Sequence, residues 1–305
     1  MLISIAFLLV FVTLLFGLAL LFFPAPIFDW TMTIARRTSG LQLFIAEIDG
    51  HQIPYLRGGK GEPLLLLHGF AANKDNWTLI ARYLTPHFDL IVPDIPGFGD
   101  SARKEDCGYG VDAQLSRLIA LVDSLDLDKI HVGGNSMGGY FGSLLGERLG
   151  ERVKTLWLVA PAGVESPQPS EMQRLVESGD NPLLVSTVAD FERLVGLCFV
   201  NPPPTPPPFQ RVLARRAIAE GAFNQRLFQD LLDDGVSLGD AQMSQRRVLI
   251  VWGTEDGILH HSSLEVFKRL YPSAEAILMN NIGHLPMVEK PLEAAQDYLR
   301  FQGKI

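Results

Sequence analysis

Ser136 is the residue of this chain that is best placed to act as a nucleophile. It lies at the centre of the string Gly-Asn-Ser-Met-Gly (residues 134–138), where an apolar segment ends and a helical pattern begins. A turn that presents a serine at the end of a strand brings the residues two before and two after it together, which only small side chains allow. The glycines at both ends satisfy this requirement. We expect Gly139 and Gly142 to let the following helix approach the strands closely.

A serine hydroxyl is a poor nucleophile at neutral pH. It needs a neutral imidazole to take its proton and a carboxylate to orient that imidazole. Asp256 follows an apolar segment at 248–252, and His284 follows another at 274–279. We therefore predict Ser136 as the nucleophile, His284 as the base and Asp256 as the acid that orients it. Glu255, which precedes Asp256, is the alternative acid.

The chain has 7 histidines, and the others are predicted to have other roles. His131 lies within an apolar strand and is expected in the core. His68 ends another such strand and is expected to order the loop that follows. The remaining histidines are predicted in solvated turns or loops, or at the start of a helix: His51, His87, His260 and His261.

The backbone after His68 is the candidate for stabilising a tetrahedral oxyanion. His68-Gly69-Phe70 directly follows the apolar segment 63–67. We expect the Phe70 N–H to point at the acyl carbonyl and the Met137 N–H to complete an oxyanion hole. This chemistry needs neither a metal nor an organic cofactor, and the sequence predicts none.

The elements that must position these residues alternate between strands and helices. Strands are predicted at 41–48, 53–57, 63–67, 88–92, 130–133, 153–159, 248–252 and 274–279, and helices at 77–83, 114–125, 137–149, 263–270 and 292–301. The first two strands surround an Asp-Gly turn and read as an antiparallel edge. The later alternation predicts a mostly parallel sheet with helices on both faces.

Residues 165–246 interrupt this alternation. They lack apolar strand segments and show helical patterns at 170–177, 187–197, 210–220 and 224–232, the second with a capping pattern of Thr187 and Asp190. We interpret this segment as a helical lid inserted after the sixth strand, which divides the core into residues 40–164 and 247–305. The proline-rich run 201–208 is interpreted as a stiff connector between lid helices rather than as a ligand for a partner domain.

The N-terminus predicts a membrane anchor. Residues 2–23 contain no charged side chain, and as a helix they would be about 33 Å long, enough to cross the hydrocarbon layer. An uncleaved transmembrane helix fits better than the alternatives, a cleaved signal peptide or a buried helix. Arg36 and Arg37 follow the span and no basic residue precedes it, so the positive-inside rule places the catalytic domain on the cytoplasmic side.

Composition excludes several classes of function. The chain has 305 residues, 26 Lys and Arg against 34 Asp and Glu, and 47% hydrophobic residues, which excludes a disordered chain and a channel with many membrane spans. A net charge of −8 without a basic stripe argues against nucleic acid as a partner. Cys107 and Cys198 lie far apart in the sequence and are predicted to be unpaired thiols.

Further motifs accompany these candidates at residues 64–70, 73–77, 93–99, 131–139, 181–184, 251–256 and 283–289. Together they make the chain, over residues 42–300, resemble α/β-hydrolases of the membrane-anchored monoacylglycerol lipase type and the cold-adapted bacterial lipases close to them. The resemblance implies an acyl-enzyme on Ser136, His284 as base and then acid, and a lipid ester such as a monoacylglycerol as substrate. It implies the same roles for Asp256, Phe70 and Met137 as above.

Two alternatives stay open. Carbon-carbon bond hydrolases of ring-cleavage products share the Gly-Asn-Ser-Met-Gly-Gly string, but their oxyanion loop differs from residues 69–72, and a membrane anchor has no evident use for a soluble diacid. A non-enzymatic ligand-binding protein on the same fold would have lost the catalytic residues that are present here. Epoxide hydrolases and haloalkane dehalogenases use an aspartate nucleophile, which Ser136 contradicts. The sequence identifies no protein partner.

Overall fold

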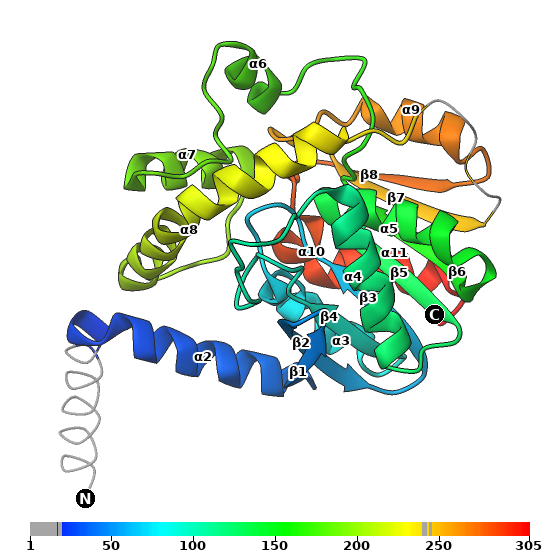
Figure 1. Ribbon diagram of the computed structural model, residues 1–305, viewed down its shortest axis with the longest axis horizontal. Coiled ribbons are helices and arrows are strands. Elements are labelled where there is room, and N and C mark those ends of the chain that lie inside the picture. The colour runs from blue at the N-terminus through cyan, green and yellow to red at the C-terminus, as the bar shows by residue number, and fades with distance from the viewer. Residues whose placement is uncertain (1–16, 18–19, 240–242, 244–245) are drawn as a thin grey trace, which may run out of the picture.

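The computed structural model describes residues 17, 20–239, 243 and 246–305, and an eight-stranded sheet forms the centre of the described chain (Figure 1). The strands lie in the order β1-β2-β4-β3-β5-β6-β7-β8. Their bounds are Gln42–Ile48, His51–Gly59, Glu62–Leu67, Phe88–Pro93, Ile130–Asn135, Val153–Val159, Arg247–Gly253 and Glu275–Met279 for β1 to β8. The β1–β2 and β2–β4 pairs are antiparallel and all other pairs are parallel. The predicted mostly parallel sheet with an antiparallel edge is confirmed.

Helices cover both faces of the sheet, as the alternation predicts. On one face lie α4 (Val111–Ser124), α5 (Met137–Leu149) and α9 (Ser263–Leu270), which share one buried apolar cluster. On the other face α3 (Thr78–Leu84) and α11 (Pro291–Phe301) share a second cluster, with the short η1 (Lys74–Trp77) and α10 (Pro286–Glu289) beside them. Because parallel strands are covered on both sides, most of their central side chains are apolar, as in the fully buried Leu64 to Leu67 of β3.

Three helices lie between β6 and β7 in the chain and gather on one side of the molecule (Figure 1). They are α6 (Glu171–Glu177), α7 (Val188–Cys198) and α8 (Pro207–Asp234). The predicted capping box of α7 is present, with Thr187 and Asp190 each bonded to the other's backbone. The two helices predicted at 210–220 and 224–232 are wrong as separate elements, because α8 is one continuous helix of 28 residues. Gly221 does not end it: a Cβ there would lie 2.4 Å from the Val185 carbonyl oxygen, so this glycine accommodates a crossing backbone.

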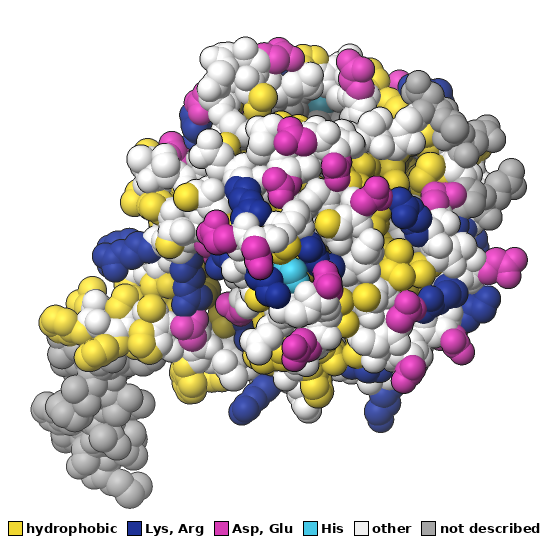
Figure 2. Space-filling view, viewed as in Figure 1, with side chains coloured by type: hydrophobic (Ala, Val, Ile, Leu, Met, Phe, Trp, Pro, Cys, Tyr) yellow, Lys and Arg dark blue, Asp and Glu magenta, His cyan; other side chains and the backbone are white. Residues whose placement is uncertain are grey.

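A helix that was not predicted, α2 (Pro24–Thr38), precedes the sheet. Its prolines lie in the first turn, where the missing N–H costs nothing. None of its residues is buried, and it lies along α8 through an ion pair of Asp29 with Arg216 (2.7 Å) and an edge-to-face contact of Phe28 with Phe209. Hydrophobic side chains gather around the start of α2 (Figure 2). The large exposed ones are Leu21, Phe22 and Phe23 just before the helix and Trp30 and Ile34 within it.

The predicted anchor at residues 2–23 lies outside the described residues except for 17 and 20–23. Within the portion that the structure describes, no helix combines the length and the apolar character needed to span a bilayer. Of the two arginines behind the orientation prediction, Arg36 forms an ion pair with Asp75. The anchor and the side of the membrane therefore stay predictions.

Candidate active site

Ser136 lies at the junction of β5 and α5 in a backbone conformation that side chains rarely adopt. Its φ is 56° and its ψ is −120°, and such strain persists only where the surroundings impose it. The Ser136 N–H donates to the Val159 carbonyl (3.0 Å), and the Ser136 carbonyl accepts from the N–H groups of Gly139 (2.9 Å) and Ala162 (3.0 Å). These bonds fix the turn from the neighbouring strand and from the helix that follows.

The glycines around Ser136 make this turn sterically feasible. A Cβ on Gly134 would lie 2.1 Å from the Gly138 carbonyl oxygen, and one on Gly138 would lie 2.3 Å from the Leu67 carbonyl oxygen. Gly139 likewise allows close approach, with Pro161 Cβ only 2.8 Å from the added atom. The expectation fails for Gly142, where an added Cβ would stand 3.4 Å from Val132, an ordinary contact.

Asp256 and His284 come together from the loops after β7 and β8. His284 Nδ1 lies 2.7 Å from Asp256 Oδ2, and both side chains are buried. The same carboxylate oxygen accepts from Trp252 Nε1 (3.0 Å), and Oδ1 accepts from the N–H groups of Ile258 (2.8 Å) and Leu259 (2.9 Å). The carboxylate is thus held in one orientation, with one oxygen directed at the imidazole.

Asn135 fastens the histidine loop to the turn that carries Ser136. Its Nδ2 donates to the carbonyl oxygens of His284 and Val159, each at 3.1 Å. The structure therefore brings the loops of Ser136, Asp256 and His284 into one region at the carboxyl ends of β5, β7 and β8. Glu255, the alternative acid, is exposed and accepts a hydrogen bond from Thr254, so its carboxylate does not share the orientation of Asp256.

The loop after β3 lies against Ser136. A Cβ on Gly69 would stand 3.3 Å from Ser136 Cβ, so the Gly69–Phe70 peptide passes directly beside the serine. The Phe70 ring packs edge-to-face on Phe98 and on Phe228 of α8. Met137 is the first residue of α5 and is buried. Both predicted oxyanion donors thus belong to segments that adjoin Ser136.

His68 is buried and orders this loop through both of its ring nitrogens. The Ile95 N–H donates to Nε2 (3.0 Å), so the proton resides on Nδ1, which lies 2.7 Å from the Gly69 carbonyl oxygen. Burial lowers the pKa of His68, so the ring is neutral at physiological pH. The structure agrees with the ordering role predicted for His68.

Two other histidines test the sequence interpretation. His131 is buried in β5 beside Thr155 Oγ1 (2.8 Å), as predicted for a core residue. His51 was expected in a solvated turn, and this is wrong: it is 1% exposed and lies 3.4 Å from the Cys107 sulfur. The physical reason is that β2 begins at His51 rather than at Ile53, which turns its ring toward the core. Cys107 and Cys198 are both unpaired, as predicted.

The last two residues of α7 contact the loops of Asp256 and His284 through their backbone carbonyls. The carbonyl of Leu197 accepts from the Gly257 N–H (3.2 Å), and the carbonyl of Cys198 accepts from the His284 N–H (2.8 Å). Burial, together with the nearby charge of Asp256, raises the pKa of the Cys198 thiol, so it stays protonated.

Three residues that support the site were not assigned a role from the sequence: Asn135, Trp252 and Glu289. The Glu289 carboxylate accepts from the Gly283 N–H (3.0 Å) with one oxygen and from the Asn201 N–H (2.8 Å) with the other. It therefore ties the residue before His284 to the proline-rich connector. The only signal in the sequence was the presence of these residues within the recurring motifs, because their partners lie far away along the chain.

The alpha/beta hydrolase fold family matches residues 62–291. Lipase 3 of Moraxella sp. (strain TA144) is 36% identical over 79% of this chain and 78% of its own length. The monoacylglycerol lipase of Homo sapiens is 27% identical over 88% of this chain and 85% of its own. A solved membrane phospholipase A, described as a bacterial virulence factor, has a TM-score of 0.90 and is 38% identical, covering 98% of each chain.

The chain therefore belongs to the alpha/beta hydrolase fold family, as its sequence resemblance indicated. Within that family it is a carboxylic ester hydrolase of the lipase type.

Proposed function

We propose that the protein cleaves acyl esters of glycerolipids through a Ser136–His284–Asp256 triad. The observation that carries this proposal is the Asp256–His284 hydrogen bond of 2.7 Å, in a loop that Asn135 binds to the strained Ser136 turn. A buried, oriented imidazole next to a serine held at a sharp turn is the arrangement that activates a hydroxyl for attack on an ester.

In this mechanism Ser136 Oγ attacks the ester carbonyl while His284 takes its proton. The N–H groups of Phe70 and Met137 stabilise the oxyanion. His284 then protonates the leaving alcohol, and the acyl group remains on Ser136. A water molecule, deprotonated by His284, attacks the acyl-enzyme and releases the fatty acid. The Nδ1–H bond to Asp256 holds the ring in the tautomer that leaves Nε2 free to accept the proton.

Lipid is the substrate class that the surface and the relatives support. We propose residues 2–23 as the membrane anchor; its last residues, Leu21 to Phe23, are exposed, and so are the apolar side chains of Trp30 and Ile34 on α2. The relatives include a monoacylglycerol lipase and a membrane phospholipase A, which both act on acyl esters of glycerol. We propose that α6 to α8, within residues 165–246, act as the lid that admits the acyl chain.

Retention in carbonate-washed membranes and release by detergent would support the anchor, whereas release by carbonate would refute it.

The decisive experiment is hydrolysis of p-nitrophenyl esters from C2 to C16 by detergent-solubilised protein, with Ser136→Ala measured alongside. We expect the wild type to cleave and the variant to lose at least about 10⁴-fold in kcat/KM. If neither cleaves but a fluorophosphonate probe labels Ser136, the triad stands and the substrate class is wrong. If neither cleavage nor labelling occurs, the proposal fails and the carbon-carbon hydrolase and binding-protein alternatives return. The kcat/KM values for monoacylglycerol and for phospholipid in mixed micelles then show which natural ester is the better substrate.

A further inference from the structure

The orientation of one peptide decides whether the Phe70 N–H can reach an oxyanion. In a planar trans peptide the carbonyl of Gly69 and the N–H of Phe70 point in opposite directions. The Gly69 carbonyl accepts from His68 Nδ1 (2.7 Å) and from the Ala72 N–H (3.3 Å), so this hydrogen bonding fixes the direction of the donor on the other side. Whatever holds His68 and the loop at 68–77 therefore holds the Phe70 N–H.

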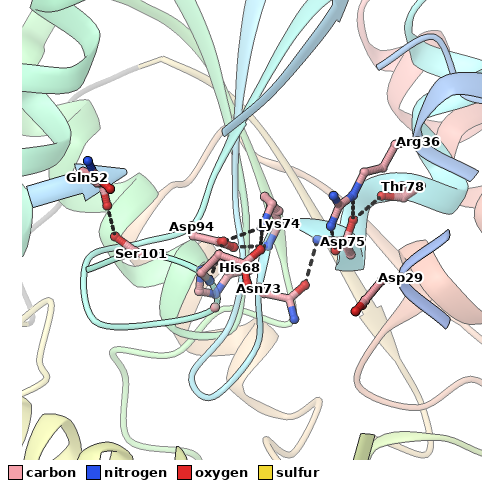
Figure 3. Close-up of polar contacts among 12 residues, drawn as sticks. Asp29, Arg36, Gln52, His68, Asn73, Lys74, Asp75, Thr78, Asp94 and Ser101 are labelled. Carbon is pink, nitrogen blue, oxygen red and sulfur yellow. Dashed lines mark hydrogen bonds and ion pairs between the residues drawn. The ribbon is translucent and has the colours of Figure 1, made fainter. Parts of the chain in front are cut away.

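A buried ion pair holds the far side of this loop (Figure 3). The Lys74 ammonium lies 2.6 Å from Asp94 Oδ2 and 2.7 Å from Asp100 Oδ2, and the Lys74 N–H donates to Asp94 Oδ1 (2.7 Å). Asp94 directly precedes Ile95, whose N–H holds His68 Nε2. Burial disfavours the charged Lys74, yet the two carboxylates outweigh that effect and raise its pKa above the ordinary value, so it remains an ammonium.

The next residue of the loop, Asp75, is held from outside by α2. Arg36 Nε and Nη2 donate to its two carboxylate oxygens at 2.8 and 2.6 Å, a bidentate pair that Figure 3 shows beside Lys74. The same carboxylate accepts from Thr78 Oγ1 (3.2 Å), and the Asp75 N–H donates to Asn73 Oδ1 (2.9 Å). Paired forks of this kind fix geometry as well as supply energy.

α2 is thus attached at its start to α8 and at its end to the loop at 68–77. Asp29 near its start pairs with Arg216 of α8, and Arg36 near its end pairs with Asp75. None of the residues of α2 is buried. These few side-chain contacts, rather than a hydrophobic core, therefore hold α2 against the rest of the protein.

We propose that Arg36 is a positioning residue for ester hydrolysis: by clamping Asp75 it holds the loop at 68–77, and through Lys74, Asp94 and His68 it keeps the Phe70 N–H directed at the oxyanion. The inference rests on the proposed function of Phe70 as an oxyanion donor. It makes the turnover rate depend on the docking of α2, the helix that follows the N-terminal apolar segment.

The test compares Arg36→Ala, Arg36→Lys, Asp75→Asn and the Arg36→Ala/Asp75→Asn double variant in the full-length protein. Arg57→Ala is the matched control, because Arg57 forms a similar bidentate pair with Asp89 (2.7 Å) that only joins β2 to β4. We expect Arg36→Ala to lower kcat about ten-fold while KM changes less than two-fold, since transition-state contacts alone are weakened. Arg36→Lys keeps the charge but loses the bidentate geometry. It should fold normally, with a kcat between those of the wild type and Arg36→Ala.

The double variant should lose no more than the Arg36→Ala variant, as expected for residues that act through one contact. Amide hydrogen exchange supplies a readout that does not depend on activity: residues 68–77 should exchange faster in Arg36→Ala than in Arg57→Ala. Equal exchange, or a kcat equal to that of Arg57→Ala, would overturn the inference. If the wild type hydrolyses no ester, the proposed function fails, and the exchange result alone decides whether Arg36 holds the loop.

Discussion

Asp256 is saturated with hydrogen bonds, and this makes its substitution informative. Its oxygens accept from two backbone N–H groups, from the Trp252 indole and from His284. In Asp256→Asn, either orientation of the amide places an NH₂ group against at least one of these donors. We expect kcat to fall about 10⁴-fold, as it does when the imidazole loses its orienting carboxylate. Steady-state kinetics on a p-nitrophenyl ester measures this.

Glu255→Gln is the control for that substitution. The Glu255 side chain is exposed and accepts only the Thr254 hydroxyl among the bonds described. Its activity should stay within two-fold of the wild type by the proposed mechanism. The assignment of the acid fails if Glu255→Gln is the more damaged variant.

At the scale of elements, the β5–α5 turn tolerates no added atom on its inner side. In Gly138→Ala the new Cβ would meet the Leu67 carbonyl oxygen at 2.3 Å, and backbone cannot move aside as a flexible side chain can. We expect a loss of about 3 kcal/mol in the free energy of unfolding. Urea denaturation followed by circular dichroism measures it.

Gly142→Ala, one turn further along α5, should behave in the opposite way. Its Cβ would make an ordinary contact of 3.4 Å with Val132, and alanine favours the helix over glycine by about 1 kcal/mol. We expect a rise in the urea midpoint with unchanged activity. A loss of stability comparable to that of Gly138→Ala would show that the close packing of α5 on β5 extends along the helix.

Elements defined by local sequence patterns were predicted well, whereas features that depend on contacts between residues remote in sequence were predicted poorly. Apolar runs and the Gly-x-Ser-x-Gly string are local patterns, so α5 and β6 match their predicted bounds. The break predicted within α8 spans Gly221, whose role depends on the Val185 backbone that crosses the helix there. α2 was missed because it lacks a buried face, and its ion pairs to Asp75 and Arg216 join residues remote in sequence.

The same limit holds for the candidate site. Ser136, Asp256 and His284 follow predicted strands, so their convergence could be anticipated from a parallel sheet. Asn135 and Glu289 could not be assigned, because their hydrogen bonds join the site to the His284 loop and to Asn201 across long stretches of chain. Tertiary hydrogen bonds of this kind leave no periodic signal.

For the whole molecule, the buried His131 predicts a specific pH dependence of stability. Burial lowers its pKa in the folded protein, while in the unfolded chain the pKa is about 6.5. Below that pH the unfolded chain binds a proton at this histidine while the folded protein does not. The contribution of the neutral His131 to the free energy of unfolding is therefore complete above pH 6.5 and is lost as the pH falls toward the pKa of the folded state. Relative to His131→Asn, the wild type should lose free energy of unfolding between pH 7 and pH 5.

Urea midpoints of both proteins at pH 7, 6 and 5 check this difference. The comparison isolates the histidine from carboxylates that titrate in the same range, such as Glu220, whose pKa is raised by burial. A constant difference in the free energy of unfolding across the three pH values would contradict the prediction.

The hydrogen bonds of the Leu197 and Cys198 carbonyls limit how the inserted segment can be exchanged between related proteins. These carbonyls accept hydrogen bonds from Gly257 and His284. Residues 197–201 therefore help to hold the core loops in place, although they lie within the insertion between β6 and β7. Exchange of the whole insertion between relatives would replace part of the scaffold that aligns the histidine. A recombinant that keeps its turnover must therefore retain the end of α7 together with the loops of Gly257 and His284, whichever parts of the insertion are exchanged. The end of α7 and the loop that carries His284 thus form one unit of exchange, although Cys198 and His284 lie 86 positions apart in the chain.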